Sequence, residues 1–504
     1  MAESIPRLGA FADAVKRDGF TDVVLLGMGG SSLAPEVIRA CIGVATGWPR
    51  FQMLDSTDPA AVLAAATPPE RTLYVLASKS GTTIEPNSLA AHFKQTLLDA
   101  GVARWAQHFI AITDEGTALA ARARAEGFRE VFINPSDIGG RYSALSFFGL
   151  VPAALMGVDV DALVGWGLAM LEAADPNRGA GVSRTAAQNP AVALGLAMGA
   201  GAKAGRDKLT LVLPQSLEAF GLWVEQLVAE STGKQGTGIV PIAGEPHADR
   251  SAYGSDRLFV RLRTNQHDAS VADEPRVDLE IPEPVALGAE FVRWEIATAI
   301  AGALLEINPF DEPNVQQAKD ATRKLLDEYR ATGRLPMPAP DRSLHGIDLT
   351  SSRAARQMLK GQDPDAILTL ISAGDYAAWL AYLGPDRALA DELASLRRAI
   401  RDRTRAATMF GDGPRYLHST GQLHKGGPNT GVFVLVTATP VQDLPIPGEP
   451  FSFGTLELAQ ALGDFASLDA TGRRALHAHL PSPDPALLRR LGEDLLARLP
   501  SRAP

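Results

Sequence analysis

VVLLGMGGSS, residues 23–32, is an apolar run that leads directly into a glycine-rich turn, and a helix-like segment opens just after it at Pro35. This order predicts a strand, a tight turn and a helix. It departs from the dinucleotide-binding fingerprint G-x-G-x-x-G/A, because Ser32 holds the position of the third glycine. Asp55, which ends the next apolar run, could imitate the acid that binds a ribose in that fold. A dinucleotide site therefore stays open as an alternative at this point.

Short apolar runs alternate with helical patterns over residues 20–135. The runs are Val23–Leu26, Phe51–Leu54, Leu73–Ala77, Phe109–Ile112 and Val131–Ile133. Strand and helix alternation at this spacing predicts a doubly wound parallel sheet. Ligands of such sheets bind beyond the carboxyl ends of the strands. The glycine-rich turn lies at one of these ends, where a ligand would bind.

A second turn with unusual chemistry, SKSGTT at residues 78–83, follows another of these runs and precedes a helical pattern. Its four hydroxyl side chains lie beside the free N–H groups of a helix start, and together they suit a phosphate dianion. An ordinary capped turn is the alternative, but capping needs fewer hydroxyls than this turn contains. The pattern favours a small phosphorylated ligand.

A third turn, Gly139-Gly140-Arg141-Tyr142-Ser143, leads into a long apolar helical region. Two glycines let the backbone approach a ligand closely, and the guanidinium beside them can stabilise an oxyanion. The alternative is a helix-entry turn in which Arg141 is simply solvated.

Three units are predicted along the chain. Residues 1–165 form a first α/β unit, and residues 166–331 contain a helical connection and a second unit that starts with a strand at Leu209–Leu213. A linker rich in Gly, Pro and Arg follows at residues 332–343, and residues 341–504 form a C-terminal α/β extension. The phrase ESTGK at 230–234 is echoed by HSTGQ at 418–422. The echo leaves two interpretations of the extension open, a partial repeat and an unrelated unit. In either case Glu230 and His418 occupy comparable turn positions, and one hypothesis is that the extension completes a site within the same chain.

The composition excludes several classes of partner. The 504 residues are 46% apolar and 21% charged, with a formal net charge of -10, which provides no basic surface for nucleic acid or for an anionic membrane. Cys41 is the only cysteine, so no internal disulfide is possible and a reducing cytoplasm is expected. The first twenty residues contain no secretory signal, and the longest apolar stretch, 144–158, is too short to span a bilayer.

Taken in order, the motifs resemble those of the glucose-6-phosphate isomerase family, which is built from sugar isomerase (SIS) domains. The matching phrases are GMGGSSL at 27–33, SKSGTT at 78–83, GGRYS at 139–143, Gln226 with ESTGK at 230–234, and NPFDEP at 308–313. The C-terminal phrase YLHSTGQLHKGGP at 416–428 most resembles the isomerase part of bifunctional transaldolase/glucose-6-phosphate isomerases. The resemblance implies two doubly wound, flavodoxin-like SIS domains followed by the α/β extension.

The resemblance also implies a reaction and a set of residues. Glucose 6-phosphate and fructose 6-phosphate would interconvert through a cis-enediol, without a metal or another cofactor. Glu230 would move the proton between C2 and C1, Arg141 would hold the enediolate charge, and His418 would open the sugar ring. The substrate would be bound by Gly30, Ser31, Ser78, Lys79, Ser80, Gly81, Thr82, Thr83 and Gln226.

Two departures from the family pattern leave choices open. The histidine phrase usually precedes Asn-Pro-Phe-Asp, whereas here it comes more than a hundred residues later, so His424 is kept as second choice to His418. The family also carries a lysine that we expect on the helix before Asn-Pro-Phe-Asp, where this chain has none. Arg293 and Lys425 are the candidates to replace it.

Other functions and states also remain as alternatives. A non-catalytic SIS-domain sensor would bind a phosphosugar without needing Glu230 or Arg141, and another phosphosugar isomerase could also accept mannose 6-phosphate. The expected partner is a small phosphorylated sugar, with neither nucleic acid nor membrane. We expect a monomer or a homodimer. The amino terminus is shorter than is usual in the family, and one hypothesis is that the chain is the downstream part of a fusion with a transaldolase domain.

Overall fold

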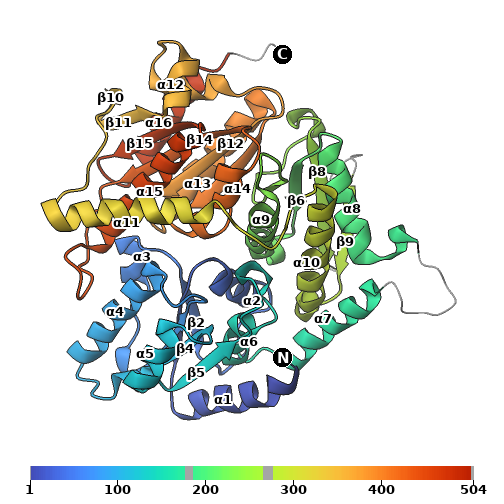
Figure 1. The fold of residues 1–504 in the computed structure, drawn as a ribbon, viewed down its shortest axis with the longest axis vertical. Coiled ribbons are helices and arrows are strands. Elements are labelled where there is room, and N and C mark those ends of the chain that lie inside the picture. The colour runs from blue at the N-terminus through green and yellow to red at the C-terminus, as the bar shows by residue number, and fades with distance from the viewer. Residues whose placement is uncertain (1, 176–184, 265–275, 501–504) are drawn as a thin grey trace.

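The first parallel sheet supports most of the candidate site residues. The structure, a computed structural model, describes residues 2–175, 185–264 and 276–500 (Figure 1). The strands are β1 (Asp22–Leu26), β2 (Arg50–Leu54), β3 (Thr72–Ala77), β4 (Phe109–Asp114) and β5 (Glu130–Asn134), in the order β2-β1-β3-β4-β5. All of them are parallel. The five runs predicted from the sequence lie within these strands, so the doubly wound sheet is confirmed.

Helices cover both faces of this sheet, as its buried strands require. Every residue of β1 is buried, with Val23 and Leu25 facing one hydrophobic core and Val24 and Leu26 facing the other. The first core is completed by α1 (Ile5–Arg17), α2 (Leu33–Cys41) and α6 (Phe147–Leu155). The second is completed by α3 (Pro59–Ala64), α4 (Ile84–Asp99) and α5 (Ala118–Glu126).

A second parallel sheet follows a helical connection. The connection consists of α7 (Val160–Ala174) and α8 (Pro190–Lys203), which pack against α10 (Leu287–Leu304). The strands are β6 (Lys208–Val212), β7 (Val240–Ile242), β8 (Arg257–Thr264) and β9 (Arg276–Ile281), in the order β7-β6-β8-β9. The helix α9 (Glu218–Thr232) carries Gln226 and Glu230. It contacts α2 of the first unit, which places the end of α9 near the first sheet.

The C-terminal sheet is mixed. Its strands are β10 (Arg342–Leu344), β11 (Ile347–Ser351), β12 (Tyr376–Tyr382), β13 (Ala407–Asp412), β14 (Gly431–Ala438) and β15 (Arg474–Leu480). Their order is β10-β11-β15-β14-β12-β13, with β10 and β11 antiparallel at one edge and the others parallel. The predicted C-terminal α/β extension is therefore confirmed.

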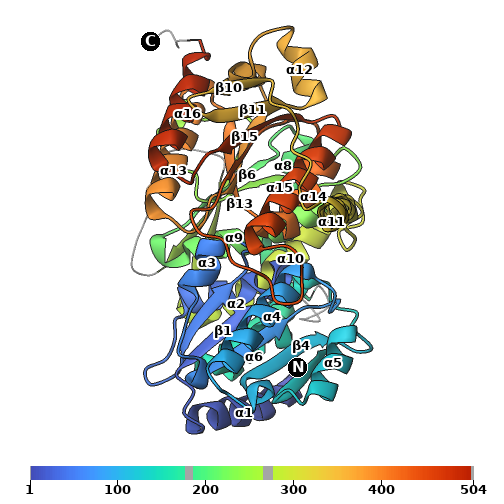
Figure 2. The same cartoon turned by 90° about the vertical axis from the view of Figure 1, so that its left-hand side faces the viewer.

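Helices lie on both faces of the C-terminal sheet as well. The helices are α12 (Arg353–Leu359), α13 (Arg387–Thr404) and α16 (Pro485–Ala497) on one face, and α14 (Gly421–Gly426) and α15 (Phe453–Ala470) on the other. Figure 2 shows the C-terminal sheet at one end of the molecule and the first sheet at the other, with α9 between them. No helix within the described ranges is long and apolar enough to cross a membrane.

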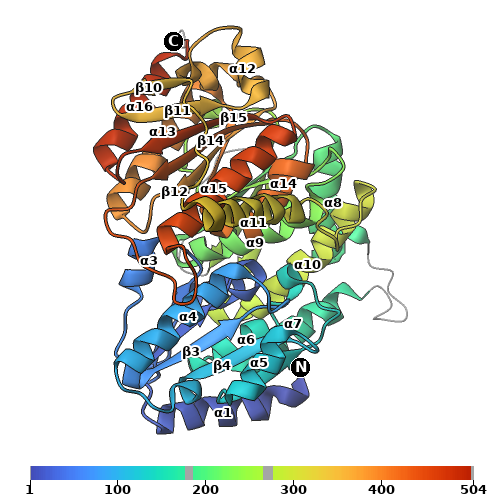
Figure 3. The ribbon, with the colours of Figure 1, turned by 60° about the vertical axis from the view of Figure 1, so that its left-hand side comes forward.

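The helix α11 (Val315–Thr332) connects the second unit to the linker. It lies alongside α15 (Figure 3), and its Leu326 joins Leu456 and Ala459 of α15 in the core that covers the first sheet. The residues between Thr332 and Arg342 contain no helix or strand, in agreement with the predicted linker. Packing of α11 and α15 against the first unit brings the C-terminal residues toward the first sheet.

Candidate active site

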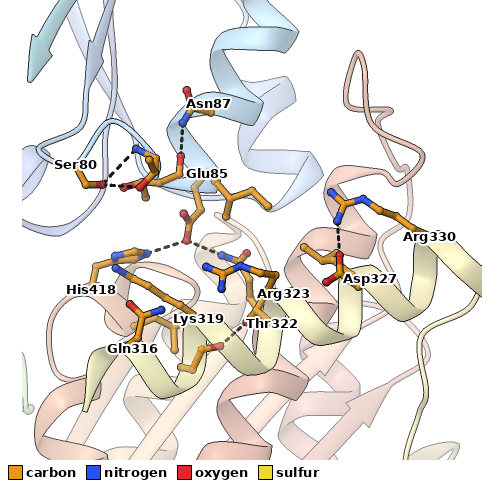
Figure 4. Close-up of a pocket in the computed structure, with 17 residues that line it drawn as sticks. Ser80, Glu85, Asn87, Gln316, Lys319, Thr322, Arg323, Asp327, Arg330 and His418 are labelled. Atoms are coloured by element: carbon orange, nitrogen blue, oxygen red, sulfur yellow. Dashed lines mark hydrogen bonds and ion pairs between the residues drawn. The ribbon is translucent and has the colours of Figure 1, made fainter. Parts of the chain in front are cut away.

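A cavity of about 520 Å³, called here the first cavity, lies beyond the carboxyl ends of β1, β3 and β4. Turns from the first sheet form one wall, and α9, α11 and the segment before α14 contribute the rest. It brings together ten of the residues predicted from the sequence: Gly30, Ser31, Ser78, Lys79, Ser80, Thr83, Arg141, Gln226, Glu230 and His418. A second cavity of about 600 Å³ shares Ser80, Thr83, Lys319 and His418 with the first (Figure 4), so the two adjoin.

The hydroxyl-rich turn after β3 is held by its own side chains. The Ser78 hydroxyl accepts a hydrogen bond from the Gly81 N–H at 3.1 Å and donates to Thr83 at 3.2 Å, and Ser80 pairs with Thr82 at 3.1 Å. Gly81 has a left-handed φ of +70°, which favours glycine. The Gly81 N–H is therefore directed at Ser78, although the sequence predicted that it would bind the ligand. Thr82 lines the second cavity, and Lys79 is paired with Asp114.

The glycine-rich turn after β1 is packed tightly against two other site segments. A Cβ on Gly30 would lie 2.1 Å from the carbonyl oxygen of Gly140, and a Cβ on Gly29 would lie 2.5 Å from that of His418. Glycine at these positions therefore lets three segments of backbone meet at the cavity. Both carboxylate oxygens of Asp55 accept hydrogen bonds from Arg415, at 2.6 and 2.8 Å. Asp55 is thus occupied, which counts against the alternative of a ribose-binding acid.

Glu230 and Arg141 form an ion pair in the wall of the first cavity. The two side chains approach to 3.3 Å, and Gln226, one turn earlier on α9, donates to the other Glu230 oxygen at 3.1 Å. Burial raises the pKa of the Glu230 carboxyl above its ordinary value, while the Arg141 charge opposes that rise. A carboxylate tuned in this direction suits proton abstraction near neutral pH.

The Arg141 guanidinium is itself fixed by partners from two segments, the end of α9 and residues 309–312. It donates to Ser231 at 2.7 Å, to the Pro309 carbonyl at 2.7 Å and to Glu312 at 2.9 Å. The side chain is only 3% exposed. These contacts hold the positive charge beside Glu230, in agreement with a functional rather than a solvated Arg141.

His418 lies opposite the hydroxyl-rich turn and is paired with Glu85. Its Nε2 lies 2.8 Å from a Glu85 oxygen (Figure 4), and both side chains are largely buried. Although burial alone would raise the pKa of Glu85, the charge and hydrogen bond of His418 hold it below its ordinary value. Gln226 donates to the His418 carbonyl at 2.9 Å, so this amide joins the His418 segment to Glu230.

The remaining three predicted residues are outside both cavities. His424 is buried among Tyr376, Tyr416 and Phe433, and neither ring nitrogen has a hydrogen-bond partner in the described part of the chain. Lys425 forms a buried ion pair with Asp464 at 2.5 Å, and Arg293 pairs with Glu290 at 3.1 Å. The structure thus separates His424, Lys425 and Arg293 from the other candidates.

Two residues that the sequence analysis missed belong to the site. Glu85 is the hydrogen-bond partner of His418. Lys319 lines both cavities and forms no ion pair with any described residue. A lysine was sought on the helix before Asn308-Pro309-Phe310, but Lys319 is on α11, the helix after it. Glu85 lies in the first turn of α4, and nothing local in the sequence distinguishes it from an ordinary acidic residue at the start of a helix.

The phrases ESTGK and HSTGQ differ in local structure. Glu230 lies near the end of α9, whereas His418 lies in a short 3-10 segment before α14. Both side chains nevertheless reach the same cavity. In the described ranges, no group of three or more His, Cys, Asp or Glu is placed to hold a metal ion.

Comparison with known proteins shows that the sequence is similar to glucose-6-phosphate isomerases. Residues 7–241 match the family model described as phosphoglucose isomerase. The glucose-6-phosphate isomerase of Thermosynechococcus vestitus is 31% identical over 354 residues, which are 60% of this chain and 65% of that protein. The glucose-6-phosphate isomerase of Nostoc sp. is 28% identical over 385 residues, 65% of this chain and 71% of that protein. The chain therefore spans about two thirds of the length of these relatives.

A solved structure agrees in fold. The crystal structure of a glucose-6-phosphate isomerase from Chlamydia trachomatis aligns with 65% of this chain and 74% of that chain, with a TM-score of 0.54 and 21% identity. At this identity the likeness concerns the fold alone.

Proposed function

Residues 7–241 match the phosphoglucose isomerase family model, and on this premise we propose that the whole chain is a glucose-6-phosphate isomerase. The reaction would be the reversible conversion of glucose 6-phosphate into fructose 6-phosphate. The observation that carries the proposal is the single cavity in which Glu230, beside Arg141, and His418, paired with Glu85, lie around a hydroxyl-rich turn. This set supplies a base, a charge stabiliser, an acid and a place for a phosphate.

The proposed mechanism begins with ring opening. His418 would give a proton to the ring oxygen as the bond from that oxygen to C1 breaks, while the C1 hydroxyl loses its proton to solvent water and its oxygen becomes the carbonyl. The Glu85 carboxylate would stabilise the imidazolium before transfer. The sugar phosphate would bind at Ser78, Ser80, Thr82 and Thr83, next to the start of α4. Lys319 would add positive charge from the opposite wall.

Isomerisation would follow in the open chain. Glu230 would take the proton from C2 and return it to C1, while the hydroxyl proton on O2 passes to O1 as C2 becomes the carbonyl. Arg141 would stabilise the negative charge of the cis-enediolate between the two carbon proton transfers. The raised pKa of Glu230 supports both directions, because a carboxyl with a raised pKa holds the abstracted proton more firmly until it is returned to C1. The proton moves between adjacent carbons without net redox change, so the chemistry needs neither nicotinamide nor a metal.

The proposal includes a structural arrangement within one chain. We propose three units at residues 1–165, 166–331 and 341–504, with the third completing the site through His418. The chain would then act as a monomer, or as a homodimer with separate sites. A cytoplasmic location agrees with the lone Cys41. Because residues 416–428 resemble the isomerase part of bifunctional enzymes, a fusion with an upstream transaldolase domain is part of the proposal.

The test compares wild type with Glu230→Gln in the conversion of fructose 6-phosphate to glucose 6-phosphate, followed by a coupled dehydrogenase. The change keeps the shape and removes the base, so we expect kcat to fall about a thousandfold. Glu225→Gln is the matched control, because Glu225 is a buried carboxyl on the same helix that lines neither cavity. Phosphosugar binding without wild-type turnover would point instead to a sensor.

A further inference from the structure

One oxygen of Glu85 accepts hydrogen bonds from two donors. His418 Nε2 lies 2.8 Å from Glu85 Oε1, and Gln460 Nε2 lies 2.6 Å from the same atom. Glu85 is on α4 of the first unit, whereas His418 and Gln460 come from the C-terminal unit (Figure 4 shows Glu85 and His418). Gln460 is 2% exposed and Glu85 is 3% exposed, so the pair is nearly buried at the edge of the second cavity.

The orientation of the Gln460 amide is set by a third hydrogen bond. Thr57, which is fully buried, donates its hydroxyl to Gln460 Oε1 at 2.8 Å. An amide presents an acceptor on one side and a donor on the other. With its oxygen occupied by Thr57, Gln460 directs its NH₂ group at Glu85. The chain of contacts Thr57–Gln460–Glu85–His418 therefore crosses between the first and C-terminal units three times.

These contacts determine which ring nitrogen of His418 carries a proton. An amide N–H stabilises a carboxylate without adding a competing charge. A charged Glu85 is acceptor-only, so His418 must carry a proton on Nε2. Nδ1 is then the nitrogen left for proton exchange with a ligand. A rotated imidazole or the other tautomer would leave the Glu85 charge buried and poorly satisfied, which is costly.

We infer that Gln460 is a positioning residue that, through Glu85, holds the His418 imidazole in the orientation and tautomer required for ring opening. The role rests on the proposed isomerase function. Gln460 lines the second cavity but not the first, and its contact with His418 runs through the shared Glu85 oxygen. The helix α15 of the C-terminal unit thus contributes to the site in addition to the His418 segment.

The experiment compares three variants with wild type. Gln460→Leu removes the donor to Glu85, Gln460→Glu keeps the length but replaces the amide by a carboxyl, and Ser467→Ala is the control. Ser467 is buried two turns later on the same helix and donates only to the Gly463 carbonyl, at 2.9 Å. All four proteins are assayed for kcat and KM from pH 5 to 9, and their folding is checked by thermal melting.

For Gln460→Leu we expect kcat to fall about tenfold while KM stays within about twofold, because positioning of a reacting group is lost rather than substrate contact. The acid limb of the pH–rate profile should move to higher pH, since the Glu85 carboxylate loses a stabilising donor. Gln460→Glu should move that limb further, because two carboxyls then share the site. Ser467→Ala should match wild type. Unchanged kinetics in a folded Gln460→Leu, or an equal loss in Ser467→Ala, would overturn the inference.

A second readout separates this inference from the proposed function. In protein labelled with ¹⁵N-histidine, the Nε2–H of His418 should give a low-field proton resonance, assigned by its loss in His418→Asn. We expect Gln460→Leu to shift or broaden that resonance and Ser467→Ala to leave it in place. This result would support the positioning role even in a chain without isomerase turnover, and an unchanged resonance would refute it.

Discussion

Arg415 donates two hydrogen bonds to Asp55, at 2.6 and 2.8 Å, across the boundary between the first sheet and the C-terminal unit. Asp55 follows β2, and Arg415 begins the 3-10 segment that ends at His418. The pair is bidentate and Asp55 is only 3% exposed. It thus fixes the segment from which His418 reaches the cavity.

Loss of this clamp should affect both stability and turnover. We expect Asp55→Ala to lower the free energy of unfolding by about 3 kcal/mol, because the Arg415 charge is left without its buried partner. The kcat should fall as well, since the His418 segment is released. Urea denaturation and the coupled isomerase assay provide the measurements. Arg489→Ala breaks the exposed pair with Glu392 and should change stability by less than about 1 kcal/mol. Equal effects of the two changes would contradict the assigned role of Asp55.

Lys319 should contribute to binding of the anionic substrate. Lys319→Met removes the charge and keeps the apolar stem, so we expect kcat/KM to fall about tenfold or more at low salt. The loss should shrink as ionic strength rises, because salt screens an exposed charge. Lys324→Met, on the same helix but outside both cavities, is the control. Similar kinetics for the two variants would remove Lys319 from the site.

His424 should matter for acid stability rather than for turnover. Burial, reinforced by the charges of Lys425 and Arg473, lowers the pKa of His424 well below its usual value. Its neutral form is therefore favoured in the folded chain, and stability is lost as pH falls below the unfolded value of about 6.5. His424→Phe should keep turnover and unfold at a lower pH than wild type in an acid titration followed by circular dichroism. A loss of kcat comparable with that of His418→Gln would return His424 to the catalytic residues.

Glu225 gives a pH dependence of the opposite sign. Burial raises the pKa of this carboxyl to about 8, although the Ala243 N–H and the Arg397 charge oppose the rise. The folded chain keeps the proton that the unfolded chain loses near pH 4.3, so stability falls as pH rises from about 4.3 to about 8. Relative to Glu225→Gln, wild type should lose about 1 kcal/mol per pH unit in that window. Urea melts at pH 5, 6, 7 and 8 measure the difference. A constant difference would mean that Glu225 is ionised when folded.

Local patterns were sufficient for the first sheet and for most of the cavity wall. The runs that became β1 to β5 are short, apolar and bounded by turns, and strands buried on both faces require that composition. Glu230, Arg141 and His418 were found from their phrases, even though His418 stands after Asn308-Pro309-Phe310 in this chain. Each of them lines the first cavity.

Residues whose roles depend on packing between distant segments could not be found in this way. Glu85 meets His418 and Gln460 only because the C-terminal unit folds against α4, and no local pattern encodes that contact. The hydrogen bond of the Gly81 N–H to Ser78 likewise depends on the final turn geometry. Lys319 was missed for a simpler reason. The family pattern points to the helix before Asn308, whereas Lys319 is on α11, the helix after it.

The cavity receives Glu230 and His418 from the same polypeptide, and this has a genetic consequence. When two subunits exchange catalytic groups, two dead alleles can complement each other by forming hybrid oligomers with an intact site. Here co-expression of Glu230→Gln with His418→Gln should yield no active hybrid, because every copy would carry its own defect. In a strain that lacks glucose-6-phosphate isomerase activity, growth would then be restored only by a copy that carries both Glu230 and His418.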